Sequence, residues 1–522
     1  MKKITVSSFF GKVLVLATGL FVFASVVSFA ETARETAKPK EWKRPWYELF
    51  EQNMAKYGIQ VQDVPYVPIL DYSQSCSLCH IAYYQQWQTS PHGRSFVDPF
   101  FQQAWAEYNE FYLRESELRK RATWLGERKG DGNLPMPELP GASQPIQKID
   151  CLSCHAPSLN VEIEFTQNKP LREFMLAMRE GYIPKIEDVI SGKVDRTLGV
   201  PKRPRPNTDI VIRKQLNYWQ RLNDYIKDGV SCDFCHTVTR MGLPTARKQI
   251  PFPEMYNQYY GVEFEHRFGL QKFGPIEETP TSGHTIGYSP VYEDSLFCAP
   301  CHQEVNAFGL VVQDTYNEWL NSPFSRPGPN YKTCQSCHMP SAKSLGLAPI
   351  PPSKHGPDRE DAHMHDFRGT TPEFLRTAAE VSLEAERQDN LVKATVNIKS
   401  TLTGHMLPTG KPYHQVVLVV RAQDEQGKVF YENIKVYERK VGKSLEFRED
   451  IPYWEADYVI SDNRIPPGGT VTETYEIDAT GVTGSVFVTA QLFYRRASKS
   501  VTRVYQLTDK PLEIHSATAE VY

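Results

Sequence analysis

The stretch CSLCH at residues 76–80 carries the pattern that decides how this chain folds: two cysteines separated by two residues, with a histidine directly after the second. The pattern occurs five times and uses all ten cysteines of the 522-residue chain. A spacing repeated this regularly indicates one chemical purpose. The five motifs, numbered in chain order, are Cys76, Cys79 and His80; Cys151, Cys154 and His155; Cys232, Cys235 and His236; Cys298, Cys301 and His302; and Cys334, Cys337 and His338.

Three common uses of paired cysteines do not account for the histidines. Disulfides suit an exported protein and zinc sites fit the spacing, but neither needs a histidine at a fixed position. A thioredoxin-like redox pair would occur once, in a βαβ context. The C-x-x-C-H pattern is the attachment motif of c-type haem, in which both thiols bind the vinyl groups and the histidine ligates the iron. The sequence therefore predicts five covalent haems and indicates no other cofactor.

The first 30 residues have the layout of a secretory signal peptide. Their only charges are three lysines, an apolar run follows at residues 13–27, and Ser28 and Ala30 offer small side chains for cleavage before Glu31. An uncleaved membrane anchor is the alternative, but a spanning helix needs about 20 apolar residues. We therefore favour cleavage and export to the periplasm or the cell exterior, with no membrane-spanning segment left afterwards.

The charge balance argues against nucleic acid as a partner. The formal net charge is −3, and removal of residues 1–30 with their three lysines makes it −6. An acidic surface of this kind repels a phosphate backbone. We expect redox proteins instead, either other cytochromes or a reductase. The basic stretch at residues 202–205 is a candidate docking patch, although we favour a solvated loop there.

Residues 31–370 are rich in Pro, Gly, Tyr and Trp, and helical spacing is visible only at 97–125, 169–182 and 208–227. Long connections between such helices are unusual in an ordinary domain. Five haem macrocycles would supply the apolar core that the polypeptide lacks. We therefore expect a mostly α and irregular domain built around five haems at residues 31–370.

Residues 371–522 contain no cysteine and alternate apolar with polar side chains, as strands do. Turns rich in Gly and Asp at 424–427 and 465–469 separate some of the runs. The pattern predicts an all-β, sandwich-like domain, joined to the haem domain by a helix at 371–381. A docking or assembly module is an alternative role for this β-domain. The predicted strands are 391–400, 415–422, 429–438, 470–477 and 485–494.

A partial repeat lies inside the haem region. A Tyr-x-x-Trp-x-x-Ser-Pro segment follows the first motif at residues 84–91 and precedes the fifth motif at residues 316–323. The two copies differ at the next residue, which is His92 in one and Phe324 in the other. We interpret the repeat as a duplicated haem-packing element that keeps its iron ligand in one copy only.

Five haems have ten axial positions, and the motif histidines fill half of them. Nine other histidines are candidates for the rest: His92, His266, His284, His355, His363, His365, His405, His414 and His515. We expect His92, His284, His365 and His405 to ligate, with His266 as the fifth and His363 as its rival. Met339 and Met406 are alternatives. His414 and His515 are not expected to ligate.

The chain resembles multihaem cytochromes related to hydroxylamine oxidoreductase and to its tetrahaem electron-acceptor cytochrome. The resemblance covers roughly residues 75–410, with a β-domain like those appended to some members. It implies closely stacked haems, mostly with two histidine ligands, in an electron-transfer protein outside the cytoplasm. Five motifs match neither group. The segments that carry the resemblance are the first motif with Tyr84, Trp87, Ser90 and His92, and residues 229–236, 334–340, 365–369 and 404–410.

These observations favour a non-catalytic electron relay in which every iron has two protein ligands. The alternative is a multihaem oxidoreductase that reduces or oxidises a small nitrogen or sulfur compound at one open iron, which needs acid–base groups nearby. Side chains of that kind lie near the expected ligands, although they more often pack on haems or pair with propionates: Tyr84, Arg94, Glu265, Arg267, Asp366 and Arg368.

Overall fold

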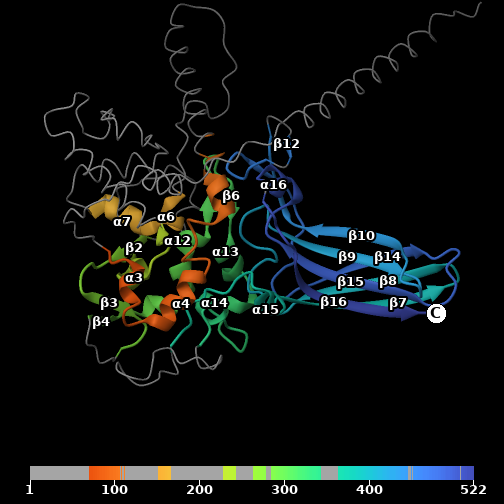
Figure 1. The fold of residues 1–522 in the computed structure, drawn as a ribbon, viewed down its shortest axis with the longest axis horizontal. Helices are drawn as coiled ribbons and strands as arrows, with labels where there is room; N and C mark the ends of the chain where they lie inside the picture. The colour runs from red at the N-terminus through yellow and green to blue at the C-terminus, as the bar shows by residue number, and fades with distance from the viewer. Residues whose placement is uncertain are drawn as a thin grey trace, which may run out of the picture.

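The computed structural model describes residues 70–105, 107–108, 111, 151–165, 227–242, 263–277, 284–341, 362–444, 448–449, 451–505 and 507–522. The predicted signal peptide at 1–30 lies outside them, as do the predicted helices at 169–182 and, except for Lys227, 208–227. The described residues form two parts that lie side by side (Figure 1). The motif part, residues 70–375, consists of short helices and loops, and the strand part, residues 379–522, consists of long strands.

Helices in the motif part are short, and each of the five motifs lies on or beside a single helical turn. The described residues between 99 and 111 are helical, in agreement with the helix predicted from residue 97. The helices are α3 (Ser73–Cys76), α4 (Ile81–Thr89), α6 (Leu152–His155), α7 (Pro157–Phe165), α11 (Cys232–His236), α12 (Ala299–His302), α13 (Thr315–Leu320), α14 (Cys334–His338) and α15 (Pro372–Leu375).

Three small two-stranded sheets and three 3₁₀ turns connect these helices. The strand pairs are β1 (Val238–Gly242) with β2 (Glu263–His266), β3 (Gln271–Gly274) with β4 (Thr285–Tyr288), and β5 (Glu304–Val305) with β6 (Val311–Gln313). The 3₁₀ turns are η3 (Pro290–Glu293), η4 (Ser295–Cys298) and η5 (Pro323–Ser325).

The strand part contains two main antiparallel sheets, with strand orders β10-β9-β15-β16 and β14-β8-β7. A third, smaller sheet has the order β12-β11-β13, and the helix α16 (Lys499–Val504) follows β15. These labels denote β7 (Ala379–Gln388), β8 (Leu391–Ser400), β9 (Gln415–Gln423), β10 (Val429–Tyr437), β11 (Arg439–Lys443), β12 (Arg448–Glu449), β13 (Tyr458–Asp462), β14 (Thr470–Asp478), β15 (Val486–Arg495) and β16 (Leu512–Val521).

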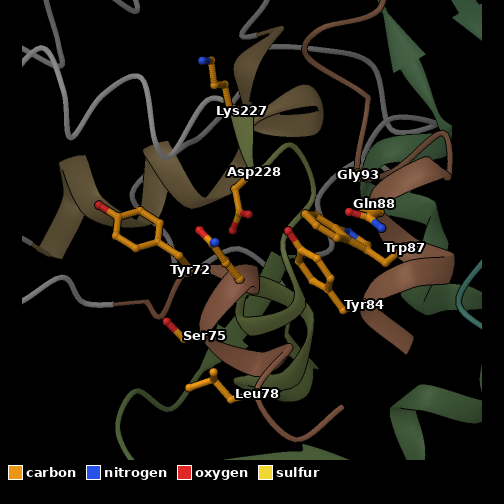
Figure 2. A pocket seen from close by; sticks show the side chains of 10 residues that line it. Tyr72, Ser75, Leu78, Tyr84, Trp87, Gln88, Gly93, Lys227 and Asp228 are labelled. Atoms are coloured by element: carbon orange, nitrogen blue, oxygen red, sulfur yellow. The ribbon is translucent and has the colours of Figure 1, made fainter. Parts of the chain in front are cut away.

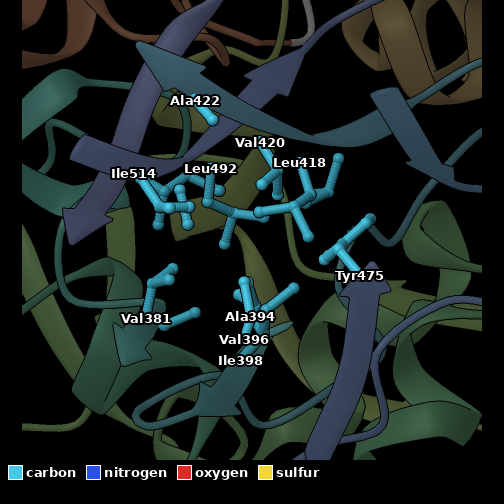
Figure 3. Close-up of a cluster of buried hydrophobic side chains, with 14 of the residues drawn as sticks. Val381, Ala394, Val396, Ile398, Leu418, Val420, Ala422, Tyr475, Leu492 and Ile514 are labelled. Atoms are coloured by element: carbon cyan, nitrogen blue, oxygen red, sulfur yellow. The ribbon is translucent and has the colours of Figure 1, made fainter. Parts of the chain in front are cut away.

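One apolar cluster fills the space between the two main sheets (Figure 3). On β8 every second side chain from Val392 to Ile398 is buried, which is the alternation that a strand with one face on a core must show. Leu418 and Val420 on β9 meet this face from the other sheet. The two sheets therefore form a sandwich around a shared core.

The strands predicted from the sequence agree with β8, β9, β10, β14 and β15 to within about a residue at each end. The predicted helix at 371–381 begins as expected, because the Thr371 hydroxyl accepts a hydrogen bond from the Phe374 N–H. It ends at Leu375, however, and β7 begins at Ala379, so its second half was wrong. Ala379 and Val381 are buried in the sandwich core, and that packing outweighs the helical propensity of the segment.

Polar contacts fasten the strand part to the motif part. Arg464 and Glu318 form an ion pair at 2.6 Å in which each side chain is only 7% exposed. Arg496 pairs with Asp98 at 2.6 Å, and Lys411 pairs with Glu304. These contacts come from widely separated strand-part loops, so the interface holds at more than one point.

Within the described residues, we find no helix that combines the length and the apolar character needed to cross a bilayer.

Leu418→Ala should lower the free energy of unfolding of the strand part by about 2–5 kcal/mol, because Leu418 is fully buried and its loss leaves a cavity. Urea unfolding followed by far-ultraviolet circular dichroism measures the change. The matched control is Ile434→Ala on β10, which is 51% exposed and should change stability by less than about 0.5 kcal/mol. Equal effects of the two substitutions would contradict a shared core.

Candidate haem-binding site

Each C-x-x-C-H motif forms one helical turn, so its two cysteines and its histidine project to the same side. In the first motif the His80 N–H donates to the Cys76 carbonyl at 2.8 Å. The third and fifth motifs have N-caps, because Ser231 and Thr333 accept hydrogen bonds from the N–H two positions into the turn. All ten cysteines are free thiols in the structure, so none is used in a disulfide.

Four of the five motif histidines face a second histidine from a distant part of the chain. The second histidines are the four that the sequence singled out first, and in each pair the ring centres are about 6 Å apart. The pairs are His80 with His284 at 6.1 Å, His302 with His92 at 6.2 Å, His236 with His365 at 6.0 Å, and His338 with His405 at 6.3 Å.

The spacing of these pairs fits a haem iron between the rings. Metal–nitrogen bonds of about 2 Å and a nitrogen about 1 Å from each ring centre require ring centres about 6 Å apart. Aromatic rings in direct contact have centres about 4.5–7 Å apart, so the pairing with a motif histidine, and not the distance alone, points to a metal ion. The gap in each pair therefore has the right size for one metal ion.

Burial favours the neutral state, which binds metal, in several of these imidazoles. It lowers the pKa of His92 and His365 to about 3 and that of His338 to about 4. A backbone carbonyl also orients several rings through Nδ1: His236 donates to Phe273 at 2.7 Å and His405 to Met406 at 2.9 Å. Such bonds leave Nε2 free for the iron.

The second motif has different surroundings. His155 Nδ1 donates to the Ser95 carbonyl at 2.8 Å, and the ring stacked on His155 is that of Phe101, with centres 3.7 Å apart. Among the aromatic contacts of the described residues, none brings a histidine ring to His155.

His266, the fifth expected ligand, instead lies beside Phe234 and Phe268 and bonds to the Thr237 hydroxyl at 2.9 Å. His355 lies outside the described residues.

The partial repeat extends into a duplicated unit that joins two motifs. The first unit consists of the first motif, α4 and the third motif, and the second unit consists of the fourth motif, α13 and the fifth motif. In both units the Tyr–Trp ring centres are 5.6 Å apart. The indole N–H of each unit donates to the carbonyl two residues before the unit's second motif, from Trp87 to Val230 at 2.7 Å and from Trp319 to Lys332 at 2.8 Å.

Serine side chains also form equivalent hydrogen bonds in the two units. Ser73 and Ser295 each lie three residues before the first motif of their unit. Each hydroxyl accepts the N–H of the first cysteine in the second motif, and both distances are 3.0 Å. The structure therefore places the two motifs of each unit in the same relative arrangement.

His92 and Phe324 occupy equivalent positions at the end of the repeat but have different neighbours. His92 faces His302, the motif histidine that begins the second unit. Phe324 faces the strand part, where a methyl group on Gly404 would lie 3.6 Å from its Cβ. The position that reaches the next unit in one copy thus contacts the strand part in the other.

Neighbouring motifs bring their thiols together. Hydrogen bonds with Cys232 and with Cys334 are the largest contributions that raise the pKa of Cys76 and of Cys298, respectively. Cys154 of the second motif is likewise beside Cys301 of the fourth. Within the described residues the motifs are therefore neighbours in the order first–third, fourth–fifth and second–fourth.

The first motif lies at the surface. Leu78, between its two cysteines, is 82% exposed, and Cys79 is exposed as well. Beside it lies an open hollow of about 640 Å³ between α3 and α4 (Figure 2). Its lining is mostly polar and aromatic, with Tyr72, Ser75, Tyr84, Trp87, Lys227 and Asp228 among its residues.

Comparison with solved structures finds a similar fold in a multihaem cytochrome. A penta-haem cytochrome c552 from Thermochromatium tepidum is 19% identical, with a TM-score of 0.53, and the match covers 87% of this chain and 100% of that chain. The fold is that of a multihaem cytochrome. No protein-family model matches the sequence, and no curated protein matches it either.

Two other solved structures match only weakly, with TM-scores too low to indicate a shared fold. They are the Northeast Structural Genomics Consortium target SoR45, with 14% identity over 27% of this chain and 84% of that chain at a TM-score of 0.14, and the C-terminal domain of wzt, with 10% identity over 27% and 70% at 0.15.

Several residues that shape these sites carry no recognisable motif. Phe367 lies between His92 and His365, with ring centres 4.0 and 6.0 Å away, and links the first unit to the fourth motif. The acid–base candidates from the sequence are partly used in ion pairs, Arg368 with Asp366 at 2.8 Å and Glu265 with Arg240. Only the structure shows these contacts, because each joins residues without a characteristic spacing.

Trp87→Phe should lower the free energy of unfolding by about 1–3 kcal/mol, because the Val230 carbonyl loses its donor in a part-buried site. Chemical unfolding followed by haem absorbance measures the change. Gln88→Ala, at the exposed neighbouring position, is the matched control and should change stability by less than about 0.5 kcal/mol. If both variants unfold alike, the indole bond does not stabilise the approach to the third motif.

Proposed function

We propose that this chain is an exported pentahaem c-type cytochrome that relays electrons between redox partners. The observation that carries the proposal is the set of four histidine pairs with ring centres 6.0–6.3 Å apart, each containing one motif histidine. Haem, when bound, supplies reversible one-electron transfer. Two histidines on an iron suit this role, because the ligand set is the same in both oxidation states.

The chain's own residues hold each group at fixed places. The ten motif cysteines attach the five haems, and the five motif histidines supply the first axial ligand. His92, His284, His365 and His405 supply the second ligand for the fourth, first, third and fifth motifs. Because each second ligand comes from a distant segment, the motifs hold one another in place.

The neighbour relations of the motifs support a continuous path through the protein. Phe367 and His92 connect the first unit to the fourth motif, which also adjoins the second and fifth. The first motif is the exposed end, since Leu78 is 82% exposed beside an open hollow. We therefore place the exchange of electrons with a partner protein at the first motif.

His92→Ala, His284→Ala, His365→Ala and His405→Ala should each turn one haem of the five high-spin, because its iron loses the sixth ligand. Electron paramagnetic resonance of the oxidised protein measures the spin state. A pyridine haemochrome assay should still give five haems per chain, since the thioether bonds are unchanged.

His363→Ala is the matched control for these variants. His363 Nδ1 donates to the Met339 carbonyl at 2.5 Å, and its ring does not face a motif histidine in the described structure. We expect this variant to stay fully low-spin. A histidine whose replacement also leaves every haem low-spin is not an axial ligand.

Redox catalysis at the second motif is the second candidate function. Phe101 rather than a histidine stacks on His155, and buried titratable side chains of the strand part lie near the motif. Tyr453 and Cys151 pack against the same buried cluster, and burial raises the pKa of the Tyr453 hydroxyl well above its usual value. Burial lowers the pKa of His414 to about 4, and its Nδ1 donates to the Thr409 carbonyl at 2.7 Å. Proton donors beside an open iron would suit reduction of a small nitrogen or sulfur compound.

Carbon monoxide binding to the reduced protein separates the two functions. Four irons are closed by histidine pairs, so carbon monoxide can bind only at the second motif, and a relay without an open iron there predicts no change in the absorption spectrum. A spectral change in one haem of the five would indicate an open iron. If Tyr453→Phe then shifts the stretching frequency of the bound carbon monoxide, the open iron lies at the second motif, and catalysis there is favoured.

A further inference from the structure

In the first unit, a side chain of α4 holds the backbone of the segment that carries a sixth ligand. The His365 N–H donates to the Gln86 side-chain oxygen at 2.7 Å. Gln86 lies directly before Trp87, inside the repeated Tyr-x-x-Trp segment. His365 faces His236, the histidine of the unit's second motif. The repeat thus reaches the second ligand of its own unit through one hydrogen bond.

In the second unit, the equivalent side chain of α13 does the same. Glu318 lies directly before Trp319, and its Oε2 accepts the Met406 N–H at 3.2 Å and the Thr409 hydroxyl at 2.6 Å. Met406 follows His405, which faces His338 of the unit's second motif. The same position of the repeat therefore holds the ligand-bearing loop in both units.

A second position of each helix contacts the same loop. The residue three positions earlier is Tyr83 in α4 and Thr315 in α13, so it lies on the same helix face. The Tyr83 ring meets the His365 ring edge-on, with centres 4.7 Å apart. Thr315 bonds to the Thr409 hydroxyl at 2.9 Å. One face of the repeat helix is thus directed at the sixth-ligand loop in both copies.

The geometry points to Gln86 and Glu318 as positioning residues that fix the sixth ligand of the second motif in each unit. This inference rests on the proposed function, in which His365 and His405 ligate iron. A ligand loop without such an anchor must lose its backbone freedom on ligation, which opposes binding of the iron. An acceptor on a helix that is itself packed against the motif removes this freedom beforehand.

The two units use different residues because their loops have different neighbours. Gln86 meets a backbone N–H, for which a neutral acceptor is sufficient. Glu318 also pairs with Arg464 at 2.6 Å, and both side chains are 7% exposed. The carboxylate gives the buried Arg464 a second acidic partner besides Asp462, which lies 2.8 Å away. Glu318 therefore both fixes the His405 loop and joins the strand part to the motif part.

Four variants of the full-length holoprotein test the inference: Gln86→Ala, Gln86→Glu, Glu318→Ala and Glu318→Gln. Each alanine variant removes the acceptor, so we expect a high-spin signal of up to one haem in five by electron paramagnetic resonance. Gln86→Glu and Glu318→Gln exchange the residues of the two units and keep an acceptor oxygen. They should retain the low-spin spectrum. Gln85→Ala, at the exposed neighbouring position of α4, is the matched control and should also stay low-spin.

The outcomes separate this inference from the ligand assignment. Low-spin spectra in both alanine variants, together with high-spin signals in His365→Ala and His405→Ala, overturn the positioning role and leave the ligands in place. Low-spin spectra in those two histidine variants overturn the ligand assignment itself. If Glu318→Ala does not fold, Gln86→Ala decides alone, because Gln86 forms no ion pair and its loss breaks no contact between the two parts.

Discussion

The pairing of two imidazoles across a gap of one metal ion is the constraint on which the rest of this structure depends. A motif fixes one histidine locally, because helical geometry sets its place beside the two cysteines. The opposing histidine must come from elsewhere, and in each of the four pairs it comes from a distant segment. The short helices and small sheets of the motif part are the connections that these four pairings require.

The sequence was sufficient for the parts of the structure that follow local rules. The five motifs, the strands β8, β9, β10, β14 and β15, and the start of α15 at Thr371 all follow from spacing or capping. β7 was misread because its segment AEVSLEAERQ is rich in good helix formers, and only the core around Val381 makes it a strand. β16 was not predicted because the apolar residues in the middle of its segment are only alanines, Ala517 and Ala519.

The proposed second ligands of the irons could be predicted only in part from the sequence. His92, His284, His365 and His405 could be named from their neighbours along the chain, but not the motif that each one faces. The positioning roles of Gln86 and Glu318 could not be predicted from the sequence, because the two copies of the repeat have different residues at this position. Their equivalence appears only in what they touch, the backbone beside His365 in one unit and beside His405 in the other.

Phe324 sets a limit on the growth of this architecture. At the equivalent place His92 reaches forward to the unit that follows, so the repeat is built to be stacked end to end. Phe324 meets the strand part instead, next to Gly404 and Gly468, where a third unit would otherwise stack. A series of such units can therefore end where Phe324 takes the place of the histidine and the sandwich covers that position. The strand part thus caps the series after two units. Its own loop carries His405, so the histidine pair of the fifth motif depends on the strand part.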